Sequence, residues 1–349
     1  MIQAYNQSVT GTGASGVREP GVAVIIVNYN GGEVLEHCLR AVEAQTLRPR
    51  RVIVVDNASH DGSVEGITAR HPAVEVIRCH ENWGFAKGNN LGIAAADECG
   101  WIACLNPYAF PKPDWLARLI TAAEAHPQFA FFGCRLVQAE HPDRLDGTGD
   151  VYHVSGLTWR RDHRQRVEQG TLADGEIFAP SAAAALYRRA DVLAVGGFDE
   201  SYFCYIEDID LAFRLRLAGH RGWYVSDAIV HHVGSAIAGT QSDFAVYHGH
   251  RNLVWTYFKN MPAELLWRYL LLHLLLNLVT ILVFAERGKA GVIFRAKWDA
   301  LKGLRKMLQA RQAVQASRRV DAAALRGVMT QGLGALYRQW RASLLFTDF

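Results

Sequence analysis

Short apolar runs alternate with amphipathic segments along the first 125 residues. Residues 22–27 (VAVIIV) and 51–55 (RVIVV) are almost continuously apolar, as strands buried on both faces require. Between them, residues 33–44 place apolar side chains at helical spacing. The alternation continues with strands predicted at 74–77 and 101–105, and with helices predicted up to about residue 70, at 85–97 and at 115–125. Strand alternating with helix predicts an α/β fold with a mainly parallel central sheet.

Polar side chains cluster where the predicted strands end, which is where such sheets bind their ligands. A carboxylate at a strand end can accept hydrogen bonds from a ribose or a base, and an aromatic ring can stack on a base. The same residue types also form ordinary turns, so both interpretations remain open at this point. The cluster comprises Asn28, Tyr29 and Asn30, then Asp56, Asn57 and Ser59, and further along Asn82 and Asn106.

The pattern changes between residues 129 and 219. Apolar runs at 129–137 and 151–159 alternate with charged loops, and residues 160–166 (RRDHRQR) predict a solvated turn. Residues 198–219 return to helical spacing. Within that helix Arg214 and Arg216 could assist a diphosphate, but a solvated helix face is the preferred interpretation.

Charge divides the chain into two parts. The net charge of +3 over 349 residues is the sum of −8 over residues 1–250 and +11 over residues 251–349, where there are 16 Lys and Arg against 5 Asp and Glu.

Residues 1–20 are polar, predict a flexible tail and lack the apolar core of a signal peptide. They contain GTGASG at 11–16, but this glycine motif precedes the first strand, whereas a dinucleotide fingerprint must follow one. An NAD-type oxidoreductase therefore ranks far behind.

The basic part contains an apolar stretch at residues 265–285. Residues 269–285 lack Asp, Glu, Lys and Arg, a run of about 17 residues at the lower limit for spanning a bilayer. One interpretation is a helical packing subdomain. The other is a helix lying on a membrane surface, with clustered Lys and Arg attracted to anionic lipid. A nucleic-acid partner is not expected, because the basic residues are interleaved with Leu rather than arranged around exposed aromatics.

Several motifs resemble glycosyltransferase family 2, and most closely its bacterial rhamnosyltransferase-like subgroup. They occur in order between residues 22 and 260: VNYNG, VVDNASHDGS, ENWGFAKGNNLGI, LNP, GGFDESYF, EDIDLAFRLRLAGH and HHVGS. The resemblance implies a GT-A fold over residues 21–250 and inverting transfer from a nucleotide-sugar donor, dTDP- or UDP-linked. It also implies a hydroxyl acceptor on a glycan or a polyprenyl-linked carrier, as in surface polysaccharide assembly. Residues 251–349 would then be the membrane-associating helical segment.

The resemblance assigns roles to individual residues. Asp208 would be the general base and Glu207 its acidic neighbour, since inverting transfer needs one carboxylate to deprotonate the acceptor hydroxyl. His232 would lie near the diphosphate and its metal, whereas His231, on the opposite face of the strand, would be structural. The donor would be bound by Tyr29, Asn30, Asp56, Asn57, Asn82, Gly84, Phe85, Asn90 and Asn106.

One position departs from the family pattern. The usual Leu-Asn-Pro-Asp, whose Asp binds the metal, reads Leu105-Asn106-Pro107-Tyr108 here. A neutral phenol is a poor ligand for Mg²⁺ or Mn²⁺. Three explanations compete: metal-independent transfer, a metal held weakly by His232 and the donor diphosphate, or impaired catalysis. Altered metal dependence is favoured because Asp208 is retained, and a non-catalytic sugar-nucleotide or glycan-binding protein is the runner-up.

Six scattered cysteines without a CxxC pair favour a reducing compartment. Together with the basic C-terminal segment, they predict a cytoplasmic protein that lies peripherally on the inner face of the plasma membrane.

Overall fold

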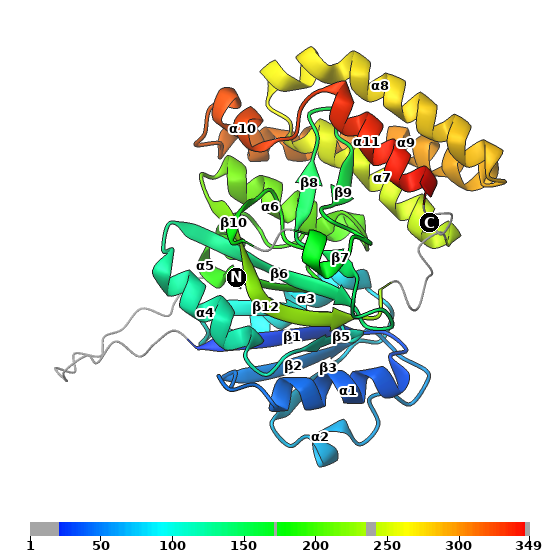
Figure 1. Ribbon diagram of the computed structural model, residues 1–349. Coiled ribbons are helices and arrows are strands. Elements are labelled where there is room, and N and C mark those ends of the chain that lie inside the picture. The colour runs from blue at the N-terminus through cyan, green and yellow to red at the C-terminus, as the bar shows by residue number, and fades with distance from the viewer. Residues whose placement is uncertain (1–20, 171–172, 235–241, 346–349) are drawn as a thin grey trace, which may run out of the picture.

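The computed structural model describes residues 21–170, 173–234 and 242–345 (Figure 1). The predicted flexible tail at residues 1–20, including its glycine motif, lies outside these ranges.

A ten-stranded, mostly parallel sheet forms the centre of the protein. Its main path runs β10-β12-β6-β11-β4-β1-β2-β3, with β5 beside β12 and β7 beside β6. Strand β11 runs antiparallel to both neighbours, β4 and β6. The strands are β1 (Val22–Asn28), β2 (Arg51–Asp56), β3 (Val74–Arg78), β4 (Trp101–Leu105), β5 (Ala109–Pro111), β6 (Phe129–Gln138), β7 (Leu145–Gly147), β10 (Gly175–Ile177), β11 (Ala184–Arg188) and β12 (Arg221–His232).

Helices cover both faces of the sheet, which explains why β1 is apolar from Val22 to Val27. Val24 and Ile26 of β1 pack with α1 (Gly32–Glu43) and α4 (Trp115–Ala125). Ala23, Ile25 and Val27 face the opposite side, toward α3 (Gly84–Ala95) and α6 (Glu207–Leu217). The short helix α5 (Arg189–Ala194) and two 3₁₀ turns, η1 (Val167–Gln169) and η2 (Glu200–Tyr202), complete this part. The predicted α/β class is confirmed.

From residue 242 to residue 345 the described chain forms five helices, at the top of Figure 1. They are α7 (Asp243–Asn260), α8 (Ala263–Glu286), α9 (Ala290–Ala316), α10 (Ala322–Val328) and α11 (Leu333–Leu345). The division predicted at residue 250 falls inside α7. Met261, Leu265 and Leu266 are buried in the same apolar cluster as one face of the sheet, so the helices share a core with the α/β part.

A small hairpin links the two parts. Strands β8 (Asp150–Tyr152) and β9 (Thr158–Arg160) pair antiparallel. Between them, the carbonyl oxygen of Ser155 lies 2.7 Å from Nδ1 of His273 on α8. The predicted solvated turn at 160–166 is wrong at its start, because Arg160 ends β9 and lines a cavity.

Two further expectations are corrected. The helix predicted up to Arg70 shrinks to α2 (Ile67–Arg70), because Gly62 and Gly66 adopt left-handed conformations (φ +75° and +68°) that interrupt a longer helix. Arg214 and Arg216 are not on a solvated face: both are buried, Arg214 against Asp210 and Arg216 against the carbonyl of Phe178.

Candidate active site

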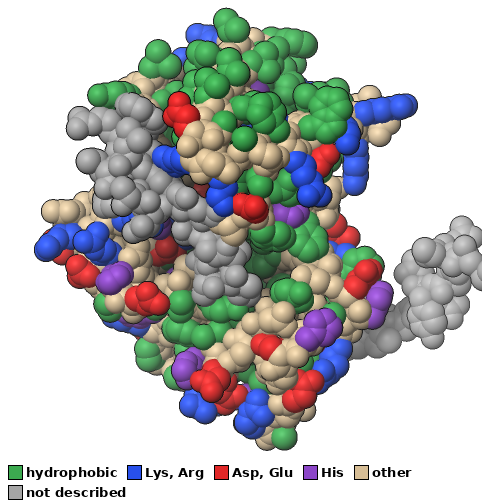
Figure 2. Space-filling model, turned by 90° about the vertical axis from the view of Figure 1, so that its right-hand side faces the viewer, with side chains coloured by type: hydrophobic (Ala, Val, Ile, Leu, Met, Phe, Trp, Pro, Cys, Tyr) green, Lys and Arg blue, Asp and Glu red, His purple; other side chains and the backbone are tan. Residues whose placement is uncertain are grey.

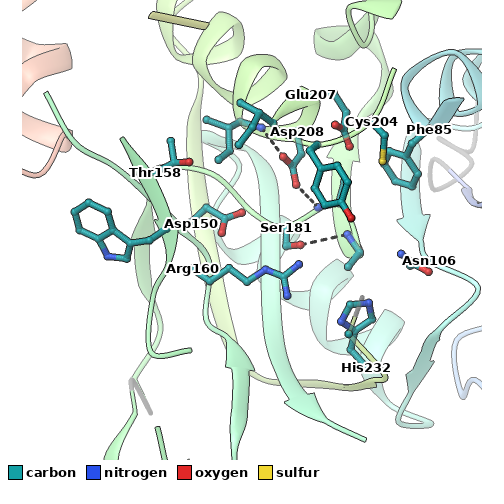
Figure 3. A pocket seen from close by; sticks show the side chains of 17 residues that line it. Phe85, Asn106, Asp150, Thr158, Arg160, Ser181, Cys204, Glu207, Asp208 and His232 are labelled. Carbon is teal, nitrogen blue, oxygen red and sulfur yellow. Dashed lines mark hydrogen bonds between the residues drawn. The ribbon is translucent and has the colours of Figure 1, made fainter. Parts of the chain in front are cut away.

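A polar cavity of about 270 Å³ opens beyond the carboxyl end of β4, beside the first turn of α6 (Figure 3). The β8–β9 hairpin forms one wall, and the end of β12 forms another. Its walls combine carboxylates, a guanidinium, an imidazole and aromatic rings. The chemistry-bearing side chains that line it are Phe85, Asn106, Asp150, Trp159, Arg160, Ser181, Tyr205, Glu207, Asp208 and His232.

A left-handed turn aims the start of α6 at the cavity. Phe203, Tyr205 and Ile206 all have positive φ (65°, 68° and 68°), a conformation that is costly for residues with a Cβ. The side-chain amide of Asn252 on α7 holds this turn: its Nδ2 donates to the carbonyls of Tyr202 (3.0 Å), Cys204 (3.0 Å) and Tyr205 (2.8 Å). Surrounding contacts therefore enforce the strained turn that positions Glu207 and Asp208.

Three carboxyl groups meet at this cavity with raised pKa values. Burial raises the pKa of Asp208, although the backbone N–H groups of Ala182 (3.0 Å) and Ile209 (2.8 Å) donate to it. Burial, and then the charge of Asp208, raise the pKa of Glu207 well above its usual range. The same two causes raise the pKa of Asp150 to about 8. Crowding without sufficient compensation favours the protonated forms, which is typical of catalytic carboxylates.

Asp146 joins Arg160 of the hairpin wall to His232 at the end of β12. Its Oδ2 accepts from Nη1 of Arg160 at 2.6 Å and from Nδ1 of His232 at 2.8 Å. Burial opposes ionisation of Asp146, but the charge of Arg160 and the hydrogen bond from His232 prevail and hold its pKa well below the usual range. Since an ionised carboxylate only accepts, His232 must donate from Nδ1. Its Nε2 is buried and has no hydrogen-bond partner within the described residues.

Of the residues assigned by resemblance, five line this cavity. They are Phe85, Asn106, Glu207, Asp208 and His232. Half-buried His231 is not among the lining residues.

The other assigned residues lie at the ends of β1 and β2 and in and around α3. Nδ2 of Asn57 donates to the carbonyl of Gly84 (3.0 Å), and Oδ1 of Asn82 accepts from the N–H of Gly84 (2.9 Å). Gly84 has φ +78°, and a Cβ there would lie 2.5 Å from the carbonyl oxygen of Phe203. This glycine therefore lets the start of α3 approach the turn before α6.

Several of these polar groups are held by hydrogen bonds within the protein. Oδ1 of Asp56 accepts from the N–H of Ser59 at 3.3 Å. Oδ1 of Asn30 accepts from the N–H of His60 at 2.8 Å. Nδ2 of Asn90 donates to the carbonyl of Phe198 at 2.9 Å, so this amide ties α3 to the segment before η2. Tyr29 is half-buried at the end of β1.

The residues at the family's metal position do not fit a divalent ion. Tyr108 is buried, and its hydroxyl donates to the carbonyl of Asn30 at 3.3 Å. Burial raises its pKa to about 12, so it remains a neutral phenol. Oδ1 of Asn106 accepts from the N–H of Tyr108. Within the described ranges no group of three or more His, Cys, Asp or Glu side chains could hold a metal ion.

Sequence reasoning missed Asp146, Asp150 and Arg160. All three belong to β7–β9, in a region where charged loops gave no periodic signal. The available signal was an arginine at the end of an apolar run, but only the hairpin pairing turns it toward the cavity.

The fold is that of the GT-A transferases. The GalNAc-T7 structure with UDP, GalNAc and Mn²⁺ superposes with a TM-score of 0.54 at 14% identity, over 69% of this chain and 48% of that one. The mannosyltransferase PcManGT from Pyrobaculum calidifontis, in complex with GDP-Man and Mn²⁺, superposes with a TM-score of 0.53 at 18% identity, over 89% and 88%.

The sequence comparisons give the family. The model of Glycosyl transferase family 2 matches residues 23–193. An N-acetylglucosaminyl-diphospho-decaprenol L-rhamnosyltransferase of Mycobacterium tuberculosis is 30% identical over 233 residues, 60% of this chain and 75% of the relative. Rhamnosyltransferase WbbL of Escherichia coli K12 is 27% identical over 219 residues, 58% and 80% respectively. The chain belongs to glycosyl transferase family 2, as the sequence motifs predicted.

Proposed function

We propose that this glycosyltransferase moves a hexosyl unit, with rhamnose the first candidate, from a dTDP- or UDP-linked donor to a hydroxyl of a glycan or polyprenyl-linked acceptor. The observation that carries the proposal is Asp208, which the strained turn before α6 presents to the cavity and which forms no ion pair with another described residue. Names of relatives in M. tuberculosis and E. coli support rhamnose and a diphospho-polyprenol acceptor.

In this proposal Asp208 is the general base. Its carboxylate takes the proton of the acceptor hydroxyl as that oxygen attacks the anomeric carbon and the diphosphate departs on the opposite face, which inverts the configuration. A raised pKa makes a carboxylate a stronger base near neutral pH. Glu207 and Asp150 limit how much negative charge the cavity holds before the donor binds, because their raised pKa values favour protonation.

The test uses the purified full chain. A thermal-shift panel of UDP- and dTDP-sugars, with EDTA, Mg²⁺ or Mn²⁺, identifies the donor. Transfer is then measured onto an N-acetylglucosaminyl-diphospho-polyprenol, and NMR of the product gives its anomeric configuration. Product with retained configuration would contradict the role of Asp208. Binding of a nucleotide sugar without transfer or hydrolysis would favour the runner-up, a sugar-nucleotide or glycan-binding protein, which the phenol of Tyr108 motivates.

The same proposal places the protein on the cytoplasmic face of the plasma membrane. Helix α8 is long and apolar enough to cross a membrane by length and composition. Its outer face carries Trp267, Leu271, Leu274, Leu275, Leu278 and Leu282, each at least half exposed, and α9 adds Phe294, Trp298 and Leu301. Figure 2 shows hydrophobic side chains gathered at the top of the molecule, with Lys and Arg beside them.

The inner face of α8 favours a helix lying on the membrane over one crossing it. His273, near the middle of α8, is buried, and its ring stacks on Tyr257 of α7 with centroids 3.9 Å apart. Leu265 and Leu266 belong to the core. A helix held to its own protein along one face can immerse the other in the lipid interface, where flanking Lys and Arg are attracted to anionic headgroups.

Point variants test this attachment better than deletion, because removing the segment after Asn260 would open the core. Leu271→Glu places a charge at a side chain that is 80% exposed, so the fold is retained. We expect it to reduce cosedimentation with phosphatidylglycerol vesicles at least several-fold. Leu193→Glu, at an exposed leucine on α5, is the matched control and should bind like the native chain. Equal binding of all three proteins, or none by the native chain, contradicts the attachment.

A further inference from the structure

The family's usual source of positive charge for a departing diphosphate is missing from this chain. Transfer leaves a nucleoside diphosphate whose oxygen gains the electron pair of the broken glycosidic bond. Stabilising that charge takes a cation or preorganised hydrogen-bond donors beside it. The neutral phenol of Tyr108, bonded to the carbonyl of Asn30, cannot replace the aspartate that would hold a metal. Some other group on this chain must carry the charge if the enzyme is active.

Arg160 is the cation that the fold places in the cavity. Figure 3 shows its guanidinium between Asp150 and His232, pointing from β9 into the space in front of Ser181. Its one recorded hydrogen bond within the described residues runs from Nη1 to Asp146 at 2.6 Å. Nε and Nη2 are therefore left for a ligand. A guanidinium is always charged and presents its donors in a fork that matches phosphate oxygens.

The wall around Arg160 is built to keep it in this position. Asp146, which is 3% exposed, binds Arg160 and His232 through the same carboxylate oxygen. This arrangement brings Arg160 of the hairpin close to His232, whose Nε2 has no hydrogen-bond partner among the described residues. His232 is 4% exposed, and a buried ring nitrogen without a partner is costly unless a ligand supplies one.

We propose that Arg160 binds the diphosphate of the nucleotide-sugar donor and takes the charge-neutralising role of the metal ion, with His232 as a hydrogen-bonding partner and Asp146 as the residue that positions both. The inference rests on the proposed function, since it takes the donor to be a nucleoside diphosphate sugar. In the step itself, the acceptor oxygen bonds to the anomeric carbon, its proton passes to Asp208, and the bond to the diphosphate breaks with its electron pair left on the phosphate oxygen. Arg160 stabilises that oxygen without taking a proton.

The test measures binding by calorimetry in EDTA. The probes are UDP and dTDP, their monophosphates, and the nucleosides uridine and thymidine. We expect Arg160→Gln to weaken the diphosphates at least 10-fold and to change the nucleosides less than 2-fold. Arg166→Gln is the matched control, because it removes the same charge from the same segment at a side chain that is 62% exposed. It should bind every probe like the native chain.

Two further variants guard against a simple loss of folding. Arg160→Lys keeps the charge without the fork, and we expect diphosphate affinity between those of the native chain and Arg160→Gln. Tyr108→Asp combined with Arg160→Gln should regain diphosphate affinity when Mn²⁺ is added, because it restores the carboxylate of the family pattern. Thermal unfolding of each variant confirms that it is folded.

The outcomes are distinguishable. If Arg160→Gln binds UDP and dTDP as tightly as the native chain does, this inference is overturned and the proposed function stays intact. The same holds if the native chain binds these diphosphates only when Mn²⁺ is present. Farnesyl diphosphate distinguishes a lipid diphosphate from a nucleoside diphosphate as the ligand of Arg160. If Arg160→Gln loses affinity for this lipid but not for UDP or dTDP, Arg160 belongs to the site of a lipid acceptor, and the assignment to the donor is overturned. A native chain that binds no nucleotide with or without Mn²⁺ overturns both proposals.

Discussion

Helix α6 presents carboxylates to two different surroundings within its first turn. Asp210 faces the core, where its oxygens accept from Arg214 (2.9 Å), Lys259 (2.7 Å) and Asn260 (2.8 Å). Burial alone would raise the pKa of Asp210, but Lys259 and Arg214 lower it to about 2. Asp208, two residues earlier, faces the cavity, and there burial prevails and its pKa rises.

The carboxylate on the core side of α6 stabilises the fold, whereas the carboxylates on its cavity side are suited to the reaction. A buried charge is tolerated where cations and hydrogen bonds compensate it, and Asp210 has both. Among the cavity carboxylates, Asp208 and Asp150 interact with the charge of Arg160, which is itself paired with Asp146. A cluster left without sufficient compensation is unfavourable for the fold, which indicates that it is retained for the reaction.

The sharpest test of this contrast is Asp208→Asn. Loss of the base should lower kcat by about 10³-fold, within the range that a positioned acid or base contributes. The affinity for the donor nucleotide should change less than about 3-fold, because no part of the donor-binding assignment depends on Asp208. Steady-state transfer and calorimetric binding measure the two quantities. Turnover within 10-fold of the native rate would remove Asp208 from the mechanism.

The equivalent change on the core side should act on stability instead. Asp210→Asn leaves the buried charge of Arg214 without its carboxylate and leaves Lys259 with only its second partner, Asp199, and we expect the free energy of unfolding to fall by about 3–5 kcal/mol. Urea denaturation followed by tryptophan fluorescence measures this. The double variant with Lys259→Met should recover part of the loss, because it removes a buried cation that has lost one of its two carboxylates. If the double variant loses as much free energy of unfolding as the two single variants together, then Lys259 does not offset the cost of burying Asp210.

Sequence patterns predicted the sheet well, because the apolar pattern of each strand and helix is visible within a short stretch of the chain. The apolar runs of β1, β2 and β4 and the helical spacing of α1 and α4 depend only on which faces are buried. The predicted bounds of β4 and α4, 101–105 and 115–125, agree with the structure. The family motifs likewise placed Asn106, Glu207, Asp208 and His232, which the structure brings to one cavity.

The rest of the site depends on contacts between distant segments. The run EDID does not reveal which carboxylate faces Lys259, because that follows from how α7 packs on α6. Arg160 looked like part of a solvated turn until its pairing with β8 placed it in the cavity. Arg214 and Arg216 looked solvated for the same reason: each buried guanidinium also bonds to a distant segment, Arg214 to the carbonyl of Val195 and Arg216 to Glu176.

A substitution in the contacts that hold the turn before α6 should have a smaller effect on turnover. Asn252→Asp keeps the size of the side chain but cannot donate to the carbonyls of Tyr202, Cys204 and Tyr205. The strained turn should relax and displace Asp208, and misplacement on the scale of 1 Å costs up to about 10²-fold in rate. We therefore expect kcat to fall about 10–100-fold, with little change in KM for the donor. A variant that is less stable but turns over at the native rate would reduce Asn252 to a purely structural residue.

The smallest effect concerns the pH dependence of stability at Asp150. Its pKa of about 8 in the folded chain exceeds the value of about 3.9 expected for an unfolded aspartate. Between pH 4 and 8 the folded state therefore holds a proton that the unfolded state has lost, and the contribution of Asp150 to stability decreases as the pH rises through this window. Asp210 contributes in the opposite sense: its lowered pKa stabilises the fold above about pH 4, and that stabilisation is lost as the pH falls toward 2.

Asp150→Asn tests the contribution of Asp150 to the pH dependence of stability separately from that of Asp210. The amide has no proton to lose, so the variant should gain about 1 kcal/mol or more over the native chain at pH 8, at least the value of one pKa unit, and little at pH 4. Melting temperatures of both proteins measured from pH 4 to 8 should diverge steadily as the pH rises. Parallel curves would mean that Asp150 is ionised in the folded state like an ordinary surface aspartate. The cavity would then hold a further negative charge next to Asp208, and the contrast between the two sides of α6 would rest on Glu207 and Asp208 alone.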